Sequence, residues 1–270
     1  FFLSENRMIT YSALQACFKS QLADFELIFF DELDSTNLYL KNYAKSHLEP
    51  AVCITGNQTA GYGQRNRHWL SSHNSVTFSF LLPISAPPSS LDGLTQLIAL
   101  KLVEILSDYT DEVLSIKWPN DIYIGSKKVG GILLEVPAFD EKSSWLIVGI
   151  GLNLKTEKSS EPSSLFDAVN AGLIQFNRLD PVSLSQFLCD LITNQKVLFE
   201  SFHSALFREY QRNYQLVDYF SKDEPVIVYY NQQNLTGLYK GLNENGELQV
   251  LIDDTLKTYR SGSVSVRPLN

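Results

Sequence analysis

Side chains suited to binding an anion are concentrated in a few short segments of this chain. Residues 50–91 contain no Asp or Glu, although the protein has 30 acidic residues in 270, and the only charges in this span are Arg65 and Arg67. Both lie in the segment 58–69, where two glycines flank Tyr62 and allow a tight turn or a close approach to a ligand. A positive segment in an acidic protein favours an anionic ligand, with phosphate as the first candidate.

A second segment has the sequence Lys117-Trp118-Pro119-Asn120-Asp121 and lies between two predicted strands. Pro119 restricts the backbone to a sharp turn, which would present Lys117 and Asn120 together. A lysine and an asparagine in this arrangement can meet the phosphates of a nucleotide and its bound metal or sugar. The alternative interpretation is a surface turn with a solvated lysine.

Two further segments combine glycines with polar side chains. Gly130 and Gly131 interrupt an apolar strand just after Lys128, which is typical of a bulge or of close approach by a ligand. The alternative is an edge strand that carries protective lysines. In the segment 149–153, a strand is expected to end in glycines followed by Asn153, and a plain turn explains this pattern equally well.

These segments need elements that hold them together, and the hydrophobic pattern predicts them. Asp34, Ser35, Thr36 and Asn37 are predicted to begin a helix over 38–43. Further helices are predicted over 8–24, 91–109 and, as one long helix, 181–214, with a polar loop over 155–164. Strands are predicted over 25–30, 51–55, 76–82, 113–116, 121–124, 128–136 and 145–149, and then over 225–230, 235–240, 247–252, 257–259 and 264–266.

The change to short strands after residue 220 predicts two domains. We expect an α+β domain over 1–220 and a small β-barrel over 221–270, in which Asn245-Gly246 forms a hairpin turn. Gly125-Ser126 predicts a second hairpin, within the first domain.

Composition excludes several classes of partner. The net charge of -8 and the pI near 5.0 argue against binding to DNA, RNA or an anionic membrane surface. No apolar run reaches the length needed to span a membrane. Cys17, Cys53 and Cys189 are odd in number and far apart, which predicts a reduced, cytoplasmic protein without disulfides or structural zinc.

Taken together, the order and spacing of these segments resemble those of the biotin–protein ligases, which attach biotin to biotin carboxyl carrier proteins. Lys117–Asp121 is the most specific of the matching strings, and the resemblance extends from about Met8 to the C-terminus. It implies a mixed β-sheet flanked by helices, like the core of class II tRNA synthetases, followed by an SH3-like barrel.

The resemblance also implies roles for individual residues. The implied biotin site comprises Ser35, Thr36, Asn37, Gln58, Gly61, Tyr62, Gly63, Gln64, Lys128, Gly131 and Ile132. The implied ATP site comprises Arg65, Arg67, Trp69, Lys117, Asn120, Asn153 and Arg267, with Mg²⁺ carried by ATP and no separate metal site. Lys128, Arg65 and Arg67 are the expected catalytic cations, because the biotin carboxylate and the α-phosphate of ATP repel one another.

The expected partner is the biotin carboxyl carrier protein of acetyl-CoA carboxylase or of another biotin-dependent carboxylase, and a homodimer is left open. Only 33 residues precede Asp34, too few for the winged helix-turn-helix of relatives that repress biotin genes, so no DNA-binding role is expected. The alternatives are a lipoate- or octanoate-protein ligase of related fold, and a non-catalytic biotin sensor.

The glycine-containing loop departs from the family pattern. Many relatives have arginine at the positions of Tyr62 and Gln64, and Asn66 replaces a frequent glycine. Neither side chain offers a charged guanidinium, so we expect Arg65, Arg67 and Lys128 to supply most of the positive charge and the adenylate to be held less tightly.

Overall fold

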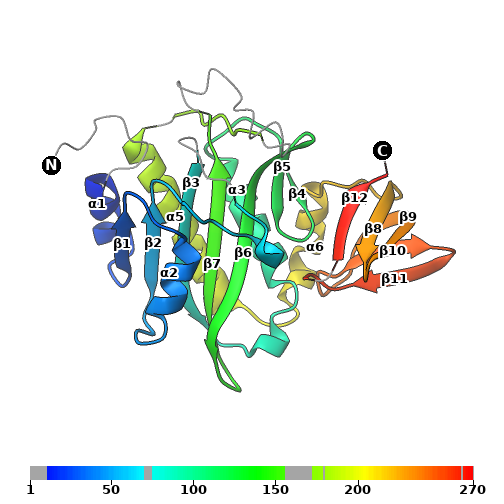
Figure 1. The fold of residues 1–270 in the computed structure, drawn as a ribbon, viewed down its shortest axis with the longest axis horizontal. Helices are drawn as coiled ribbons and strands as arrows, with labels where there is room; N and C mark the ends of the chain where they lie inside the picture. The colour runs from blue at the N-terminus through cyan, green and yellow to red at the C-terminus, as the bar shows by residue number, and fades with distance from the viewer. Residues whose placement is uncertain (1–10, 70–74, 156–171, 179, 263, 270) are drawn as a thin grey trace.

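A computed structural model describes residues 11–69, 75–155, 172–178, 180–262 and 264–269. Its larger sheet has seven strands in the order β1-β2-β3-β7-β6-β5-β4, and a second sheet of five strands lies at the C-terminal end (Figure 1). The predicted polar loop 155–164 lies almost wholly outside the described residues.

The larger sheet is mixed, as predicted. β1 (Glu26–Phe30) and β2 (Ala51–Thr55) are parallel, and all other neighbours are antiparallel. The remaining strands are β3 (Ser75–Ile84), β4 (Leu114–Lys117), β5 (Asp121–Ile124), β6 (Lys127–Phe139) and β7 (Ser144–Asn153). The expectation that β7 would end at its glycines is wrong, because the strand pairs with β3 as far as Asn153.

Helices cover both faces of this sheet, which explains the nearly continuous burial of its central strands. Alternate residues of β2 divide between two apolar cores: Val52 and Ile54 belong to the larger core, and Ala51 and Cys53 to the smaller. α1 (Tyr11–Gln21), α3 (Leu94–Leu106) and α5 (Pro181–Ser201) contribute to the larger core, whereas α2 (Thr36–Tyr43) packs on the smaller core (Figure 1). The mixed sheet flanked by helices is therefore confirmed.

The helix predicted over 181–214 is in fact two helices. α5 ends at Ser201, and α6 (Leu206–Leu216) begins after a short connection. The hydroxyl of Ser201 donates to the carbonyls of Val197 and Leu198, which ends the helical ladder with side-chain hydrogen bonds. Apolar residues on either side of the break keep the helical spacing, so periodicity alone does not reveal it.

The cysteines also differ from expectation. Cys17 of α1 and Cys189 of α5 are joined as a disulfide, with their Cα atoms 6.6 Å apart, whereas Cys53 is buried and free. The prediction of a chain without disulfides is therefore wrong. Sequence separation concealed the pair, because the two cysteines are 172 positions apart in the sequence, on two helices that pack side by side.

The second sheet is antiparallel, with strand order β11-β10-β9-β8-β12. Its strands are β8 (Pro225–Tyr230), β9 (Gln233–Leu242), β10 (Leu248–Ile252), β11 (Thr255–Tyr259) and β12 (Val264–Pro268). Gly246 has a φ of 73° in the predicted hairpin turn between β9 and β10. Among the described residues, no pairing joins β11 to β12, so the sheet is not a closed barrel.

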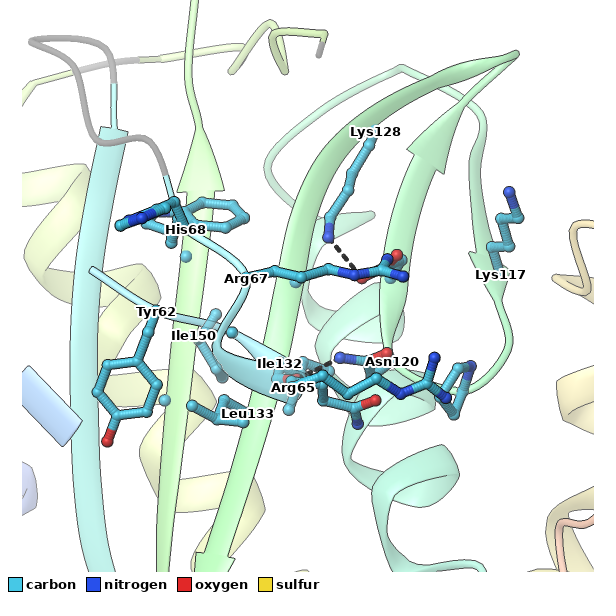
Figure 2. A pocket seen from close by; sticks show the side chains of 18 of the residues that line it. Tyr62, Arg65, Arg67, His68, Lys117, Asn120, Lys128, Ile132, Leu133 and Ile150 are labelled. Carbon is cyan, nitrogen blue, oxygen red and sulfur yellow. Dashed lines mark hydrogen bonds and ion pairs between the residues drawn. The ribbon is translucent and has the colours of Figure 1, made fainter. Parts of the chain in front are cut away.

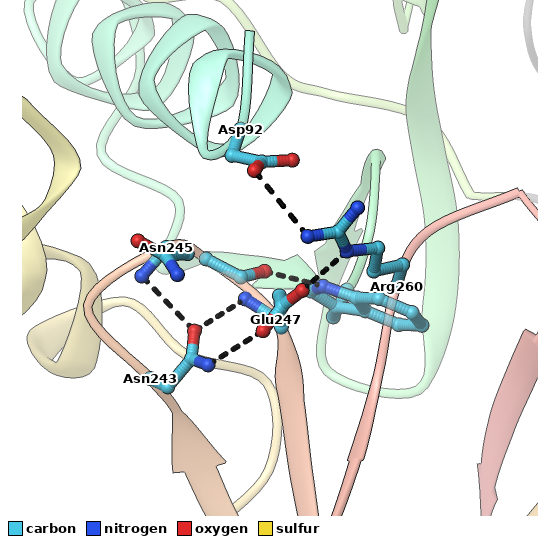
Figure 3. A network of polar contacts seen from close by, with 7 residues as sticks. Asp92, Asn243, Asn245, Glu247 and Arg260 are labelled. Carbon is cyan, nitrogen blue, oxygen red and sulfur yellow. Dashed lines mark hydrogen bonds and ion pairs between the residues drawn. The ribbon is translucent and has the colours of Figure 1, made fainter. Parts of the chain in front are cut away.

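The two sheets meet beside the Lys117–Asp121 turn (Figure 3). The indole Nε1 of Trp118 donates to the carbonyl of Gly246 at 3.0 Å, and Trp118 is only 2% exposed. Arg260 pairs with Glu247 at 2.7 Å and with Asp92 at 3.7 Å, which adds charged contacts around the same junction (Figure 3). The turn that carries Lys117 and Asn120 is thus held by the C-terminal sheet.

No helix within the described part of the chain is both long enough and apolar enough to cross a membrane.

Candidate functional site

A cavity of about 710 Å³ lies where β6 and β7, the loop 58–69, the Lys117–Asp121 turn and β12 converge. Its lining includes all but one of the predicted site residues: Ser35, Thr36, Asn37, Gln58, Tyr62, Gly63, Gln64, Arg65, Arg67, Trp69, Lys117, Asn120, Lys128, Gly131, Ile132, Asn153 and Arg267. The exception is Gly61. A Cβ there would lie 2.6 Å from the Gln58 side chain and 2.9 Å from the Trp69 carbonyl, so Gly61 allows the loop to pack tightly.

One end of the cavity is neutral and rich in hydrogen bonds. It is formed at the start of α2, where the hydroxyl of Ser35 accepts from the backbone N–H of Leu38 and caps the helix. Gln58 Oε1 accepts from the backbone N–H of Thr36 at 2.9 Å, and the Thr36 and Ser79 hydroxyls are 2.7 Å apart. Ser79 in turn donates to Asn37 Oδ1 at 2.6 Å.

Glu135 of β6 lies behind this neutral end. Its carboxylate accepts from Asn37 Nδ2 at 2.9 Å, from the Tyr62 hydroxyl at 2.8 Å and from Lys41 at 3.1 Å. Burial disfavours the charged form, but the hydrogen bonds from Asn37, Tyr62 and Lys41 outweigh it and hold the pKa of Glu135 below its usual value. Glu135 is therefore an anion at neutral pH.

The other end of the cavity is cationic. The ammonium of Lys128 pairs with Asp121 at 2.6 Å and lies 5.7 Å from the centre of the Trp69 ring. Arg67 extends toward this ion pair, while Tyr62 points away from it on the opposite side (Figure 2). Asn120 donates to the carbonyl of Ile132 at 2.7 Å, which ties the turn to β6.

Lys117 lies among aromatic rings. Its ammonium is 5.1 Å from the ring centre of Tyr123, 5.2 Å from that of Tyr219 and 5.9 Å from that of Phe220. Burial, together with the nearby Arg267 and Lys128, lowers the pKa of Lys117 despite the attraction of Asp121. The rings compensate part of the lost hydration, so Lys117 can remain a cation facing the cavity.

Two residues of the loop make contacts that sequence reasoning did not anticipate. Arg65, at a φ of 60°, donates through its guanidinium to the carbonyls of Gly262 at 2.8 Å and Val264 at 2.7 Å. The loop is thereby attached to the C-terminal sheet. The indole of Trp69 lies directly on Gly151, where a Cβ would be only 2.4 Å from the ring, and its buried Nε1–H has no partner within the described residues.

Comparison with known proteins agrees with this geometry. The model of the biotin/lipoate A/B protein ligase family matches residues 29–153. A protein named bifunctional ligase/repressor BirA from Salmonella typhimurium is 25% identical over 250 residues, which cover 92% of this chain and 76% of that protein. The biotin–[acetyl-CoA-carboxylase] ligase of Paracoccus denitrificans is 26% identical, with coverage of 80% and 90%.

A solved structure of biotin protein ligase from Aquifex aeolicus in complex with biotin and ATP has a TM-score of 0.70 and 27% identity. The match covers 90% of this chain and 99% of the other. Residues 29–153 of this chain therefore match the biotin/lipoate A/B protein ligase family.

Sequence reasoning missed three side chains that shape the cavity. Glu135 and Ser79 hold Asn37 from two sides, and Asp121 neutralises Lys128. The only available signal for Glu135 was an acid in an otherwise apolar strand. Ser79 carried no such signal, since a serine in a buried strand is ordinary without knowledge of its neighbours.

Two further predicted residues, Asn153 and Arg267, line the same cavity. Asn153, at the end of β7, accepts from Ser75 at 3.0 Å and is 4% exposed. Arg267 of β12 lies 5.2 Å from the ring of Tyr229. His68 also lines the cavity.

Proposed function

We propose that this protein is an ATP-dependent biotin–protein ligase. One observation carries the proposal: a single cavity has a neutral hydrogen-bonding end around Thr36 and Gln58 and a cationic end. That end is lined by Arg67, Lys117, Lys128 and Arg267, with Asp121 as the only acid among the described lining residues. Biotin has the same polarity, with a neutral ureido head and a carboxylate tail. The tail would meet the α-phosphate of ATP at the cationic end.

In the proposed first step, a biotin carboxylate oxygen attacks the α-phosphorus, the bond to the β-phosphate breaks, and pyrophosphate leaves. Lys128 and Arg67 offset the repulsion between the two anions and stabilise charge on phosphorus. Mg²⁺ is proposed to arrive with ATP, and Lys117, Asn120, Asn153 and Arg267 to hold the nucleotide. We retain Arg65 as a catalytic cation in this proposal, although its guanidinium is engaged with the C-terminal sheet.

In the second step, a lysine amine of the acceptor attacks the acyl carbon of biotinyl-5′-AMP. A C–N bond forms, the amine loses a proton, and AMP leaves. The loop 58–69 is proposed to exclude water from this mixed anhydride, which limits wasteful hydrolysis.

The acceptor is proposed to be a biotin carboxyl carrier protein, as implied by the name of the Paracoccus relative. We also propose that 1–220 forms the catalytic domain, that 221–270 has an SH3-like arrangement, and that the protein is cytoplasmic. The cysteine argument for that location no longer applies, because Cys17 and Cys189 are paired. A homodimer stays open.

The assay that tests the proposal contains the protein, Mg·ATP, biotin or lipoate, and a purified biotin-acceptor domain, which is then weighed by mass spectrometry. We expect a gain of one biotinyl group that requires ATP. A gain only with lipoate would support the lipoate ligase, and tight biotin binding without transfer would support a sensor.

Substitution of Lys128 provides the internal check. Lys128→Met should slow transfer about 100-fold or more, because an electrostatic contact to the developing charge is lost. Lys127→Met is the matched control: it removes the neighbouring lysine, which is exposed, and should retain full activity. Equal rates for the two variants would contradict the role proposed for Lys128.

A further inference from the structure

The neutral end of the cavity contains a chain of hydrogen bonds whose direction can be worked out. The chain begins at Glu135, passes through Asn37 and Ser79, and ends at Thr36 on the cavity wall. Ser79 is fully buried and Thr36 is 3% exposed, so water does not compete freely along it. Each link is determined by the number of protons available to its members.

An ionised carboxylate can only accept, so Asn37 must offer Nδ2 to Glu135 and keep Oδ1 for Ser79. Gly149 makes room for this amide, because a Cβ there would lie 2.0 Å from Asn37 Oδ1. Ser79 has one hydroxyl proton, and it is committed to Asn37 at 2.6 Å. Ser79 can therefore only accept from Thr36.

Thr36 also has one hydroxyl proton and two neighbouring acceptors, Ser79 at 2.7 Å and Gln58 Oε1 at 3.1 Å. If the proton pointed to Gln58, the oxygens of Thr36 and Ser79 would face each other at 2.7 Å with no proton between them, which is repulsive. Gln58 Oε1 is already served by the Thr36 backbone N–H at 2.9 Å. The Thr36 proton therefore goes to Ser79.

Two consequences follow at the cavity wall. The Thr36 hydroxyl donates its hydrogen bond to Ser79, so its lone pairs can accept a hydrogen bond from a ligand. Gln58 Oε1 already accepts from the Thr36 backbone, so Nε2 of Gln58 remains as a donor. An acceptor beside a donor complements a cyclic urea or amide, in which N–H lies next to C=O.

We propose that Glu135 is a positioning residue that sets the proton direction of the Asn37–Ser79–Thr36 chain, so that Thr36 recognises an N–H group of the ligand head. This inference rests on the proposed function for the identity of that head as the ureido group of biotin. Glu135 does not line the cavity and acts only through the chain.

Glu135→Gln tests the proposal, because an amide can accept from Asn37 or donate to it. Asn37 is then free to flip, and Thr36 can point its proton into the cavity. We expect biotin affinity, measured by calorimetry, to fall about tenfold or more, since a buried N–H would lose its acceptor. The KM for biotin should rise in parallel, while kcat at saturating biotin and the KM for ATP should change less than about threefold.

Lys41→Met is the matched control. Lys41 is half-exposed and binds the same carboxylate from outside the chain, so its loss should change biotin affinity less than about twofold. Tyr62→Phe removes the other contact that Glu135 makes, the one to the loop, and should cost less than Glu135→Gln. Because Tyr62 itself lines the cavity, the deciding comparison is with Lys41: a loss for Lys41→Met equal to that of Glu135→Gln would overturn the proposal.

Ser79→Ala provides a second test, which remains usable if Glu135→Gln folds poorly, and the two substitutions can also be combined. Ser79→Ala cuts the same chain at its centre and should weaken biotin binding to a similar degree. If the chain acts as one unit, Glu135→Gln combined with Ser79→Ala should be no worse than the worse single variant. Fully additive losses would overturn the proposal.

Wild-type behaviour separates the two hypotheses. A wild type that binds biotin but does not transfer it would contradict the proposed function and leave the Glu135 comparison readable by calorimetry. A wild type without affinity for biotin would overturn both.

Discussion

Tyr62 joins the glycine-containing loop to β6 through a side-chain hydrogen bond. Arginine is frequent at this position in the family that the sequence resembles, whereas here the Tyr62 hydroxyl donates to Glu135 at 2.8 Å. Burial and the Glu135 carboxylate raise the pKa of Tyr62, so the hydroxyl keeps its proton and remains a neutral donor. The loop therefore has a hydrogen bond to β6 but no charge on this side of the cavity.

Gln64 lines the cavity as well, and it too can hydrogen-bond a phosphate without neutralising it. We expect Gln64→Arg to release biotinyl-AMP more slowly than wild type, by about tenfold, because a charge-assisted contact is gained. Release can be followed by filter binding of preformed, radiolabelled adenylate. Gln15→Arg, which adds the same charge on the exposed face of α1 beside β1, should not slow release. Equal or slower release from wild type than from Gln64→Arg would contradict the prediction.

At this scale, sequence reasoning located cavity residues better than it located their partners. Lys128 and Asn37 were predicted from segments that the family resemblance brings together. Asp121 belongs to the Lys117–Asp121 segment, but the sequence of that segment does not indicate that the Asp121 carboxylate faces Lys128 across a hairpin. Ion pairs between neighbouring strands depend on the strand register, and the identity of a single residue does not indicate that register.

At the scale of elements, the loop 58–69 is held at its end and in its middle by different parts of the fold. Trp69 packs on β7 through Gly151, and Arg65 binds two carbonyls next to β12. The loop is thus a bridge between the two sheets, and its order depends on both.

We expect Arg65→Lys to loosen this bridge, because an ammonium cannot span the carbonyls of Gly262 and Val264 as the planar guanidinium does. The loss of about 1 kcal/mol should speed amide hydrogen exchange in the loop roughly fivefold. Arg67→Lys is the control, since within the described part of the chain Arg67 makes no such contact to the C-terminal sheet. Unchanged exchange in Arg65→Lys would show that the contact does not order the loop.

Element type was predictable wherever local chemistry determines it. β2 and β8 have the predicted bounds, and α2 begins at the predicted capping residues. The break between α5 and α6 was missed because Ser201 and its neighbours do not interrupt the apolar spacing. The disulfide was missed because it depends on helix packing between α1 and α5.

At the scale of the whole molecule, Asp218 lies where the two sheets join. The segment around it pairs with β4 through Ile116, and its carboxylate accepts from the Tyr239 hydroxyl of β9 at 2.5 Å. Burial raises the pKa of Asp218 to about 7, against the opposing effect of the Tyr239 hydrogen bond. The folded protein therefore holds a proton here that the unfolded chain releases near pH 4.

A raised pKa in the folded state stabilises the fold at low pH and loses this contribution as pH rises through 7. We expect the free energy of unfolding to fall by about 2 kcal/mol between pH 5.5 and pH 8 because of this group. Asp218→Asn should abolish that fall in urea titrations. Asp223→Asn should not, because the hydrogen bond from Lys240 holds the pKa of Asp223 below its usual value, outside this range. A fall that persists in Asp218→Asn would assign the pH dependence to other groups.

The overall architecture could be predicted only in outline. A mixed sheet with helices on both faces and a later antiparallel sheet followed from the order of elements and from the family resemblance. The order β1-β2-β3-β7-β6-β5-β4 did not, because it places β7 between β3 and β6 and depends on contacts between distant segments. The closed barrel that we expected at the C-terminus is instead an open antiparallel sheet among the described residues.

Because Lys128 is already paired with Asp121, an anion that binds Lys128 must replace Asp121 as its partner. A phosphate that takes over the ammonium leaves Asp121 without its counter-charge in a half-buried place, which offsets much of the gain. A divalent cation that travels with the phosphate can compensate that aspartate. The cavity would then bind a polyanion complexed with a metal better than the same polyanion without one. The reason is that the metal-free form leaves the Asp121 carboxylate without a counter-charge.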